Sequence, residues 1–361
     1  MSKVKLGDVA IEHKETCKGS KDGYPIVGLE HLVPEEVTLT TWDEGSDNTF
    51  TKMFRKGNVL FGRRRAYLKK AAVAPFDGIC SGDITVIEAI PDRILPELLP
   101  FIIQNDDLFD FAVGKSAGSL SPRVKWEYLK NYEFELPDMD KQRELAELLW
   151  AMDATKKSYQ KLIAATDELV KSQFMEQFFY SEKYQLVPIS SVVDRKIKKK
   201  KDISKDFEEI RYIDISSINN QSKRVTGYVE FPIDETPSRA QQVLEKGDIL
   251  ISTVRPNLQN IAVNPYSEEN VVASTGFCVL RCEKCLPEYI WGVITSEAFT
   301  NAMCEQASGI SYPAVRDSDI LQYLIPDAPI EIQEQFAAFV RQSDKSKFAV
   351  LSCSNLNLSG P

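Results

Sequence analysis

The feature that most constrains the fold of this chain is an internal repeat. Residues 54–75 (FRKGNVLFGRRRAYLKKAAVAP) align without a gap to residues 244–265 (LEKGDILISTVRPNLQNIAVNP), and eight of the 22 positions are identical. Unrelated sequences should match at about one or two of these positions. At an offset of 191 residues, the Gly-x-x-x-Pro-x-Val pattern that begins at Gly118 recurs at Gly309. The sequence therefore predicts two copies of one structural unit.

A stretch without glycine or proline separates the two copies. The chain holds 17 glycines and 18 prolines, yet none lies between Asp138 and Val187. Apolar side chains recur there at spacings of three and four, which is typical of one face of a helix. At 1.5 Å per residue the most regular part would form a rod of about 60 Å, which is too long to pack inside one compact domain. The predicted seam for a second helix consists of Leu145, Leu148, Met152, Thr155, Tyr159, Leu162, Thr166 and Leu169, with Phe336 and Phe339 on the second helix.

Outside this stretch, short β-branched runs between turn residues indicate strands, as in residues 83–87 and 247–251. The expected fold is mixed α/β (α+β), with two duplicated globules and long helices that form an antiparallel coiled-coil pair in a pseudo-twofold arrangement. A duplicated domain with a plain linker helix is the alternative. The expected boundaries are 1–137 for the first globule, 138–183 for the central helix, 184–328 for the second globule, and 329–361 for a shortened C-terminal helix with a Ser- and Asn-rich end.

Composition excludes several classes of protein. The chain has 361 residues, is 43% hydrophobic and carries a formal net charge of −9, which excludes wholesale disorder and a coat of nucleic acid by bulk positive charge. No apolar run approaches the ~20 residues of a transmembrane helix, and the N-terminal segment does not resemble a signal peptide. The seven cysteines, an odd number, do not predict a disulfide framework. We expect a soluble, cytoplasmic protein.

Motifs for catalysis are scarce in the sequence. The two histidines, His13 and His31, are expected at the surface or in turns. Residues 114–116 (Gly-Lys-Ser) resemble the end of a phosphate-binding loop, but the first glycine of that motif would fall at Phe109. No glycine-rich fingerprint for a nucleotide or a methyl donor follows a predicted strand. We therefore expect neither catalytic residues nor a cofactor in this chain.

A group of cysteines could form a metal site. Cys282 and Cys285 form a C-x-x-C motif, with Cys278 before it and Cys304 after it. Thiolates at this spacing can chelate zinc tetrahedrally. Against zinc, Cys278 lies in an apolar strand pattern, where a buried free thiol is ordinary, and the first copy has no cysteine in the equivalent turn. No metal site is predicted, and zinc binding stays an open alternative.

Basic residues gather at a few places in this acidic chain. Lysine and arginine contacts to phosphates supply non-specific affinity for DNA, and arginine also binds guanine edges in the major groove. For any single lysine, a solvated charged surface is the alternative. The predicted DNA-binding residues of the first copy are Arg63, Arg64, Arg65, Tyr67, Lys69, Lys70, Lys115, Arg123 and Lys125. Those of the second copy are Arg255 and Arg316, with Lys198, Lys199 and Lys200 from the basic run 195–201.

These features together resemble the specificity (S) subunit of type I restriction–modification systems, the HsdS family. The resemblance rests on the Lys-Gly-Asn and Lys-Gly-Asp blocks at Lys56 and Lys246, the two Gly-x-x-x-Pro-x-Val loops, and the helices that open at Gln142 and Gln333. It covers nearly the whole chain. It implies two target-recognition domains that each read one half of a bipartite, asymmetric DNA site. The helices would fix the spacing between the halves and dock methyltransferase subunits.

The resemblance also implies which chemistry belongs to partners. An S subunit is not an enzyme: two methyltransferase (M) subunits bind S-adenosylmethionine and methylate adenine, and restriction (R) subunits use ATP and magnesium. The family's acidic residue before the helix-opening glutamine is replaced by Lys141 and Ile332, and the second helix has no counterpart to residues 167–179. We expect that helix to be short, or to be completed by another chain.

Three other functions fit parts of the pattern. The chain could be the recognition subunit of a type II-like restriction–modification enzyme, or a nuclease that cuts DNA by itself with carboxylates and a divalent metal. It could also be a coiled-coil scaffold without a role on DNA. The resemblance favours double-stranded DNA and the M and R subunits as partners, with no membrane.

Overall fold

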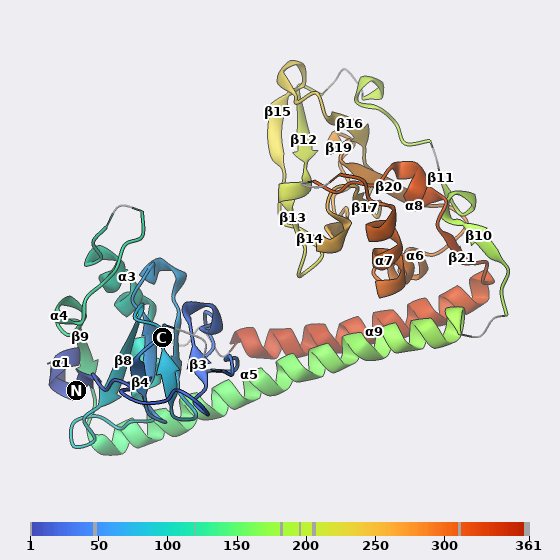
Figure 1. Ribbon diagram of the computed structural model, residues 1–361. Helices are drawn as coiled ribbons and strands as arrows, with labels where there is room; N and C mark the ends of the chain where they lie inside the picture. Colours follow the sequence, from blue (N-terminus) through green and yellow to red (C-terminus); the bar gives the residue numbers. More distant parts are fainter. Residues whose placement is uncertain are drawn as a thin grey trace. The chain divides into compact units, whose positions relative to one another are not determined.

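The computed structural model describes residues 2–45, 49–118, 120–180, 183–194, 196–203, 207–309 and 312–356, with side chains up to residue 347. The chain divides into two compact units, Met1–Ser158 and Tyr159–Pro361 (Figure 1). Each unit mixes β-sheets with short helices, and one long helix runs through the boundary between them. The expected mixed α/β fold with two repeated units is confirmed.

Unit 1 is built around a four-stranded antiparallel sheet with the strand order β2–β8–β5–β6. Val59 of β5 lies opposite Ile87 of β8, and the first four residues of β8 are buried, as expected for a β-branched run. A three-stranded sheet, β3–β7–β4, and the ladder β1–β9 complete the strands. Their bounds are β1 (Ser2–Lys5), β2 (Ala10–Glu12), β3 (Ile26–Val27), β4 (Lys52–Phe54), β5 (Val59–Gly62), β6 (Ala71–Val73), β7 (Gly78–Cys80), β8 (Ile84–Ala89) and β9 (Glu133–Leu136).

Most helices of unit 1 contribute to an apolar cluster on one face of its central sheet, whereas Leu29 of η1 packs against a second cluster on the other face. Phe61 of β5 stacks on Phe109 of α3, with the ring centroids 5.5 Å apart. Both rings belong to a buried cluster that extends to Ala146 on the long helix α5. The helices are α1 (Leu6–Val9), η1 (Leu29–His31), η2 (Ala66–Leu68), α2 (Leu99–Ile103), α3 (Asp106–Gly114), α4 (Trp126–Leu129) and the start of α5 (Met139–Phe174).

Unit 2 contains a larger sheet with the strand order β11–β20–β17–β18–β14–β13. The run expected as a strand at 247–251 forms β17, which pairs with β20 as β5 pairs with β8 in unit 1. A four-stranded sheet, β15–β12–β19–β16, and the ladder β10–β21 accompany it. The bounds are β10 (Leu186–Pro188), β11 (Val193–Asp194), β12 (Glu209–Ile213), β13 (Ile218–Asn219), β14 (Arg224–Val225), β15 (Val229–Pro232), β16 (Ala240–Val243), β17 (Ile249–Ser252), β18 (Ile261–Val263), β19 (Val271–Ser274), β20 (Phe277–Cys282) and β21 (Leu324–Pro326).

In unit 2 the end of α5 packs against α9. The ring of Phe174 lies 5.3 Å from that of Phe336, and Asp167 forms an ion pair with Lys347. Because residue 174 meets 336 and residue 167 meets 347, the two helices run antiparallel, and Figure 1 shows α9 beside the C-terminal part of α5. The helices are η3, a π-helical turn (Met175–Phe179), η4 (Ile189–Ser191), η5 (Lys200–Asp202), η6 (Ile215–Ser217), η7 (Ile233–Glu235), η8 (Pro256–Leu258), α6 (Pro287–Ile294), α7 (Glu297–Gln306), α8 (Asp317–Leu321) and α9 (Ile330–Leu356).

The packed side of α5 differs from the predicted seam by one residue. Val170 and Phe174 pack into the core of unit 2, whereas Leu162 and Leu169 are 53% and 55% exposed. One residue is a rotation of about 100° around a helix. The bulky ring of Phe174, buried against α6 and α9, decides which side faces the core. The other predicted seam residues differ in burial. The one that is buried is Phe336; those that are partly buried are Phe339, Met152, Tyr159 and Thr166; those that are exposed are Leu145, Leu148 and Thr155.

Both long helices begin with the same glutamine contact. The Oε1 atom of Gln142 accepts the Leu95 N–H at 2.8 Å, and its Nε2 atom donates to the Pro137 carbonyl at 2.9 Å. Gln333 makes the equivalent bonds in unit 2, at 2.9 and 2.8 Å. Each glutamine is buried, so its side chain ties the helix start to the globule that precedes it. Among the helices in the described ranges, none is long and apolar enough to cross a membrane.

Candidate nucleic-acid interface

Each unit contains the same pair of loops, joined by the same backbone hydrogen bonds. In unit 1, residues 63–69 leave β5 and include η2. The Arg65 N–H donates to the Pro122 carbonyl at 2.8 Å, and the Val124 N–H donates to the Arg63 carbonyl at 3.0 Å. We call this arrangement the loop frame; in unit 1 it comprises residues 63–69, 117–118 and 120–124.

The loop frame of unit 2 comprises residues 253–259, 308–309 and 312–315. The Arg255 N–H donates to the Pro313 carbonyl at 2.7 Å, and the Val315 N–H donates to the Thr253 carbonyl at 2.9 Å. Gly309 has a φ of 105°, and a Cβ there would lie 3.0 Å from the Tyr312 carbonyl oxygen, so this position requires glycine. The repeated sequence blocks therefore encode one backbone shape twice.

Two residues in each loop frame have left-handed backbone without being glycine. The φ angle is 55° at Arg65 and 50° at Lys69 in unit 1, and 51° at Arg255 and 48° at Gln259 in unit 2. For a residue with a Cβ atom this conformation costs roughly 1–2 kcal/mol. Such strain often marks a functional segment. The strain occurs at the same positions in both units, so it is a property of the backbone shape that the two loop frames have in common.

One carboxylate holds two arginines in the loop frame of unit 1. Asp83, in the turn before β8, accepts from Arg123 Nε at 2.7 Å and from Arg64 Nη1 at 3.3 Å. Arg64 Nε also donates to the Ser121 hydroxyl at 2.6 Å. The hydrogen bond from Arg123 is the main cause that lowers the pKa of the Asp83 carboxyl, so Asp83 is ionised at neutral pH. Two predicted DNA-binding residues, 59 positions apart in the sequence, are thus brought together.

Three predicted lysines of unit 1 have partners within the unit. Lys69 Nζ donates to the Asp106 carboxylate at 2.6 Å, and Lys70 Nζ donates to the Leu29 carbonyl at 2.7 Å. Lys115 Nζ lies 5.8 Å from the centroid of the Phe111 ring. These contacts anchor the loops, and they engage Nζ, the only side-chain nitrogen that a lysine could offer to DNA.

The remaining predicted residues of unit 1 lie around the same frame. Arg65 and Tyr67 are exposed, and Lys125 is exposed at the N-cap of α4, next to the frame residue Val124. Arg63 is partly buried, and its buried Nε atom has no hydrogen-bond partner among the described residues. The frame of unit 1 therefore presents a local cationic surface.

Unit 2 presents a different set of side chains. The guanidinium of Arg255 lies 4.7 Å from the ring centroid of the exposed Tyr312, in cation–π contact. Arg316 is exposed at the N-cap of α8, directly after the frame. The predicted residues Lys198, Lys199 and Lys200 lie beside β16 of the four-stranded sheet instead, and Lys200 Nζ donates to Thr236 Oγ1; Arg195 lies outside the described residues.

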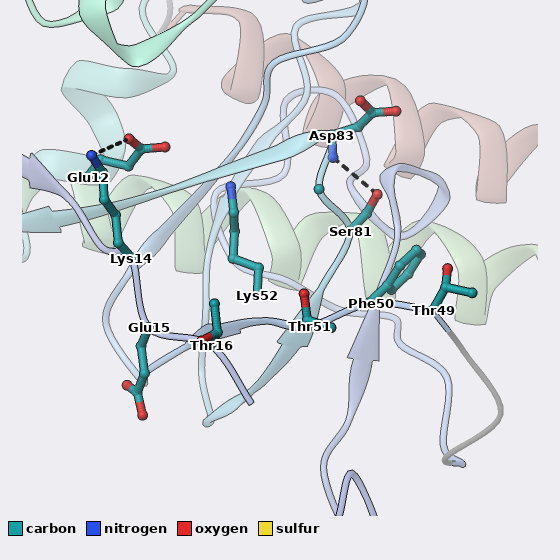
Figure 2. A pocket seen from close by; sticks show the side chains of 11 residues that line it. Glu12, Lys14, Glu15, Thr16, Thr49, Phe50, Thr51, Lys52, Ser81 and Asp83 are labelled. Carbon is teal, nitrogen blue, oxygen red and sulfur yellow. Dashed lines mark hydrogen bonds and ion pairs between the residues drawn. The ribbon is translucent and has the colours of Figure 1, made fainter. Parts of the chain in front are cut away.

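A polar pocket of about 510 Å³ adjoins the arginine cluster in unit 1. Figure 2 shows Lys52 between the segment that carries Glu12 and Thr16 and the turn that carries Ser81 and Asp83. Lys52 Nζ donates to a backbone carbonyl at 2.7 Å, and burial lowers the pKa of this ammonium group. Asp83 belongs both to the lining of the pocket and to the arginine cluster. Its carboxylate points away from Lys52 and bonds Arg123.

Of the cysteines considered for zinc, Cys282 and Cys285 have side chains in contact with each other, as their C-x-x-C spacing suggests. Cys278 and Cys285 are buried, and Cys304 is exposed in α7. Cys285 donates its S–H to the Val192 carbonyl at 3.4 Å. Within the described residues, these thiols do not converge as a set of three ligands. The side chains that do are Glu30 and His31 of η1 together with Asp43, and both acids are exposed.

Sequence reasoning missed three residues of the site: Asp83, Ser121 and Tyr312. Ser121 and Tyr312 lie inside the repeated Gly-x-x-x-Pro-x-Val loops, so the repeat alone could have selected them. Asp83 lies outside the aligned blocks, and its role follows only from the pairing of β5 with β8, which places its turn beside Arg63.

Comparisons with known proteins agree with this duplicated architecture. A family model described as the type I restriction modification DNA specificity domain matches residues 1–165 and again residues 181–353. A search of curated proteins gave no match.

Solved structures of similar fold cover nearly the whole chain. The S subunit of a type I restriction–modification system from M. genitalium is 13% identical, with a TM-score of 0.55, and the match covers 98% of this chain and 92% of that one. A chain from a structural study of the assembly and conformational transition of the type I R-M system is 19% identical, with a TM-score of 0.53 and coverage of 98% and 95%. These likenesses concern the fold.

Proposed function

The chain belongs to the family of type I restriction–modification DNA specificity domains and acts in DNA recognition, and we propose that each unit binds one half of a split DNA sequence. The observation that carries the proposal is the loop frame. It recurs in both units with the same backbone hydrogen bonds but with different side chains. A common scaffold with different side chains would place two unlike sets of donors on DNA, and the recognised sequence would be asymmetric.

The long helices α5 and α9 are proposed to set the spacing of the two halves and to dock partner subunits. Two observations support this role. The buried Gln142 and Gln333 fix each helix to its globule, so a shift of the helix is transmitted to the unit. Leu148, Leu162 and Leu169 are exposed on α5 at spacings of 14 and 7 residues, which places apolar side chains along one side of the helix.

The chemistry of the complex is proposed to belong to M and R subunits, with S-adenosylmethionine, ATP and magnesium bound there. The loop frames support this division, because their main cations are arginines. A guanidinium stays protonated at every physiological pH and cannot take up or release a proton in a reaction, although it binds phosphates and base edges well. This chain would then determine where the partner subunits act.

Mapping of modified bases in the native host tests the proposal. Deletion of this chain, with the partner genes intact, is expected to abolish methylation at one split sequence motif, and a plasmid copy is expected to restore it. Unchanged methylation after deletion would contradict a role in DNA recognition.

A further inference from the structure

Equivalent positions in the two loop frames can be assigned from backbone hydrogen bonds alone. The Arg63 N–H donates to the Asp83 carbonyl at 3.0 Å, and the Thr253 N–H donates to the Gly276 carbonyl at 2.9 Å. Asp83 in unit 1 therefore corresponds to Gly276 in unit 2. By the bridges at the loop ends, Arg64 corresponds to Val254 and Arg123 to Ala314.

The frames thus contain one arginine that both units share and a charged cluster that only unit 1 has. Arg65 and Arg255 occupy the same left-handed position, and both are exposed. The cluster of Arg64, Asp83 and Arg123 is replaced in unit 2 by valine, glycine and alanine. A contact to the phosphate backbone carries no sequence information and can be the same in both units, whereas contacts that specify bases must differ between unlike half-sites.

Building on the proposed function, we propose that Arg64 and Arg123 contact base edges in the half-site of unit 1, and that Asp83 is a positioning residue for both. Arg65 and Arg255 would contact phosphates. This division assigns sequence readout in unit 1 to a cluster that joins the two loops of the frame.

The geometry of the cluster suits base readout. Arg64 donates through Nε to Ser121 and through Nη1 to Asp83. Arg123 donates through Nε and Nη2 to Asp83. Among the described residues nothing bonds Arg64 Nη2 or Arg123 Nη1, and the two side chains are 38% and 43% exposed. Each guanidinium is therefore held in place while one nitrogen stays open to a ligand. A pre-positioned side chain loses less conformational entropy on binding than a free one.

The shared carboxylate also allows two cations to lie side by side. Without Asp83 the like charges of Arg64 and Arg123 would repel, and each side chain would sample other rotamers. The role of Asp83 is thus to orient the two guanidinium groups. Its replacement should affect discrimination between bases more than the stability of the fold.

The test uses the assembled complex of this chain with its methyltransferase subunits. The probes are duplexes that carry the motif mapped for the wild type, and duplexes with one base pair changed in either half. Arg64→Ala and Arg123→Ala are each expected to bind the matched duplex about 10-fold more weakly and to lose discrimination in one half only, while the other half is read as before. Asp83→Asn is expected to lose discrimination in the same half.

Arg65→Ala provides the contrast within the frame. It is expected to weaken binding to all duplexes alike and to lower the slope of log K against log salt concentration by about one. Arg55→Ala is the matched control, because Arg55 is also 40% exposed and paired with two carboxylates, Glu15 and Asp77, outside the frame. This control should retain discrimination in both halves.

Two outcomes would overturn the inference. In the first, Arg64→Ala and Arg123→Ala leave discrimination between duplexes intact while the melting temperature of the protein is unchanged. In the second, they weaken binding to all duplexes equally and lower the salt slope, as the loss of a phosphate contact would. A wild-type complex that does not discriminate between any of the duplexes would instead overturn the proposed function itself.

Discussion

At the scale of single residues, each loop frame holds an arginine in a backbone conformation that costs folding free energy. Arg65 and Arg255 keep a left-handed backbone where glycine would be relaxed. A residue that serves stability alone would not be expected there, and each arginine lies at the exposed surface. Substitutions at these two positions should therefore change DNA binding and the stability of the fold independently.

Arg65→Gly tests this separation. Glycine removes the Cβ strain, so the variant is expected to be about 1 kcal/mol more stable than Arg65→Ala, which keeps the strain. Both variants lack the guanidinium and should bind DNA equally weakly in the assembled complex. Urea unfolding of the isolated chain checks the first part and binding to duplex DNA the second. Equal stability of the two variants would show that residue 65 is not strained.

The Asp83 cluster predicts a defined pH dependence. The pKa of Asp83 is lowered in the folded chain, so its ion pairs stabilise the fold above the ordinary carboxyl pKa and are lost as the pH falls through the lowered value. The stability difference between the wild type and Asp83→Asn should therefore be constant from pH 5 to 8, at about 1 kcal/mol or less. It should shrink below about pH 4. Thermal unfolding across this range measures it, and a difference that changes between pH 6 and 8 would contradict it.

At the scale of secondary-structure elements, unit 2 is held together where α5, α6 and α9 meet. Phe174 contacts Phe336 of α9, and the backbone of α6 approaches the same ring at Gly292. A Cβ at Gly292 would lie 2.6 Å from the Phe174 ring, well inside van der Waals contact. The close approach of these helices therefore depends on the missing side chain.

Gly292→Ala is expected to destabilise unit 2 by about 1–3 kcal/mol, because the Phe174 ring must shift in a packed core. Gly114→Ala is the matched control: Gly114 also lies in a helix, α3, and a Cβ there meets nothing within 4 Å. The control should be neutral or stabilising by up to about 1 kcal/mol. Chemical denaturation compares the two, and equal effects would refute the contact between α5 and α6.

The elements also show how far sequence reasoning reaches. The strands at 83–87 and 247–251 and the long helix follow from periodicity and turn residues, which are local signals. The packed face of α5 does not, because Leu169 and Val170 fit a helical seam equally well until the ring of Phe174 meets α6. Asp83 was missed for a similar reason: only the tertiary pairing of β5 with β8 brings it to Arg123.

At the scale of the whole molecule, duplication followed by divergence explains the two units. The backbone bonds of the loop frame are retained in both, although Asp83 is replaced by Gly276 and Ser121 by Tyr312. Retained backbone bonds keep the loops in one shape, so side chains can change without loss of the fold. A formal net charge of −9 is compatible with DNA binding, because Arg64, Arg65 and Arg123 form a local cationic surface on the loop frame of unit 1.

Whether each unit reads its own half of the DNA site can be measured from the sequence motif around modified bases. The motif is compared between cells that express the wild-type chain and cells that express the double variant Arg64→Ala/Arg123→Ala. We expect a split motif for the wild type, and a variant motif that keeps one half and relaxes in the other. A continuous wild-type motif, or a variant in which both halves change equally, would contradict the claim that each unit reads its own half.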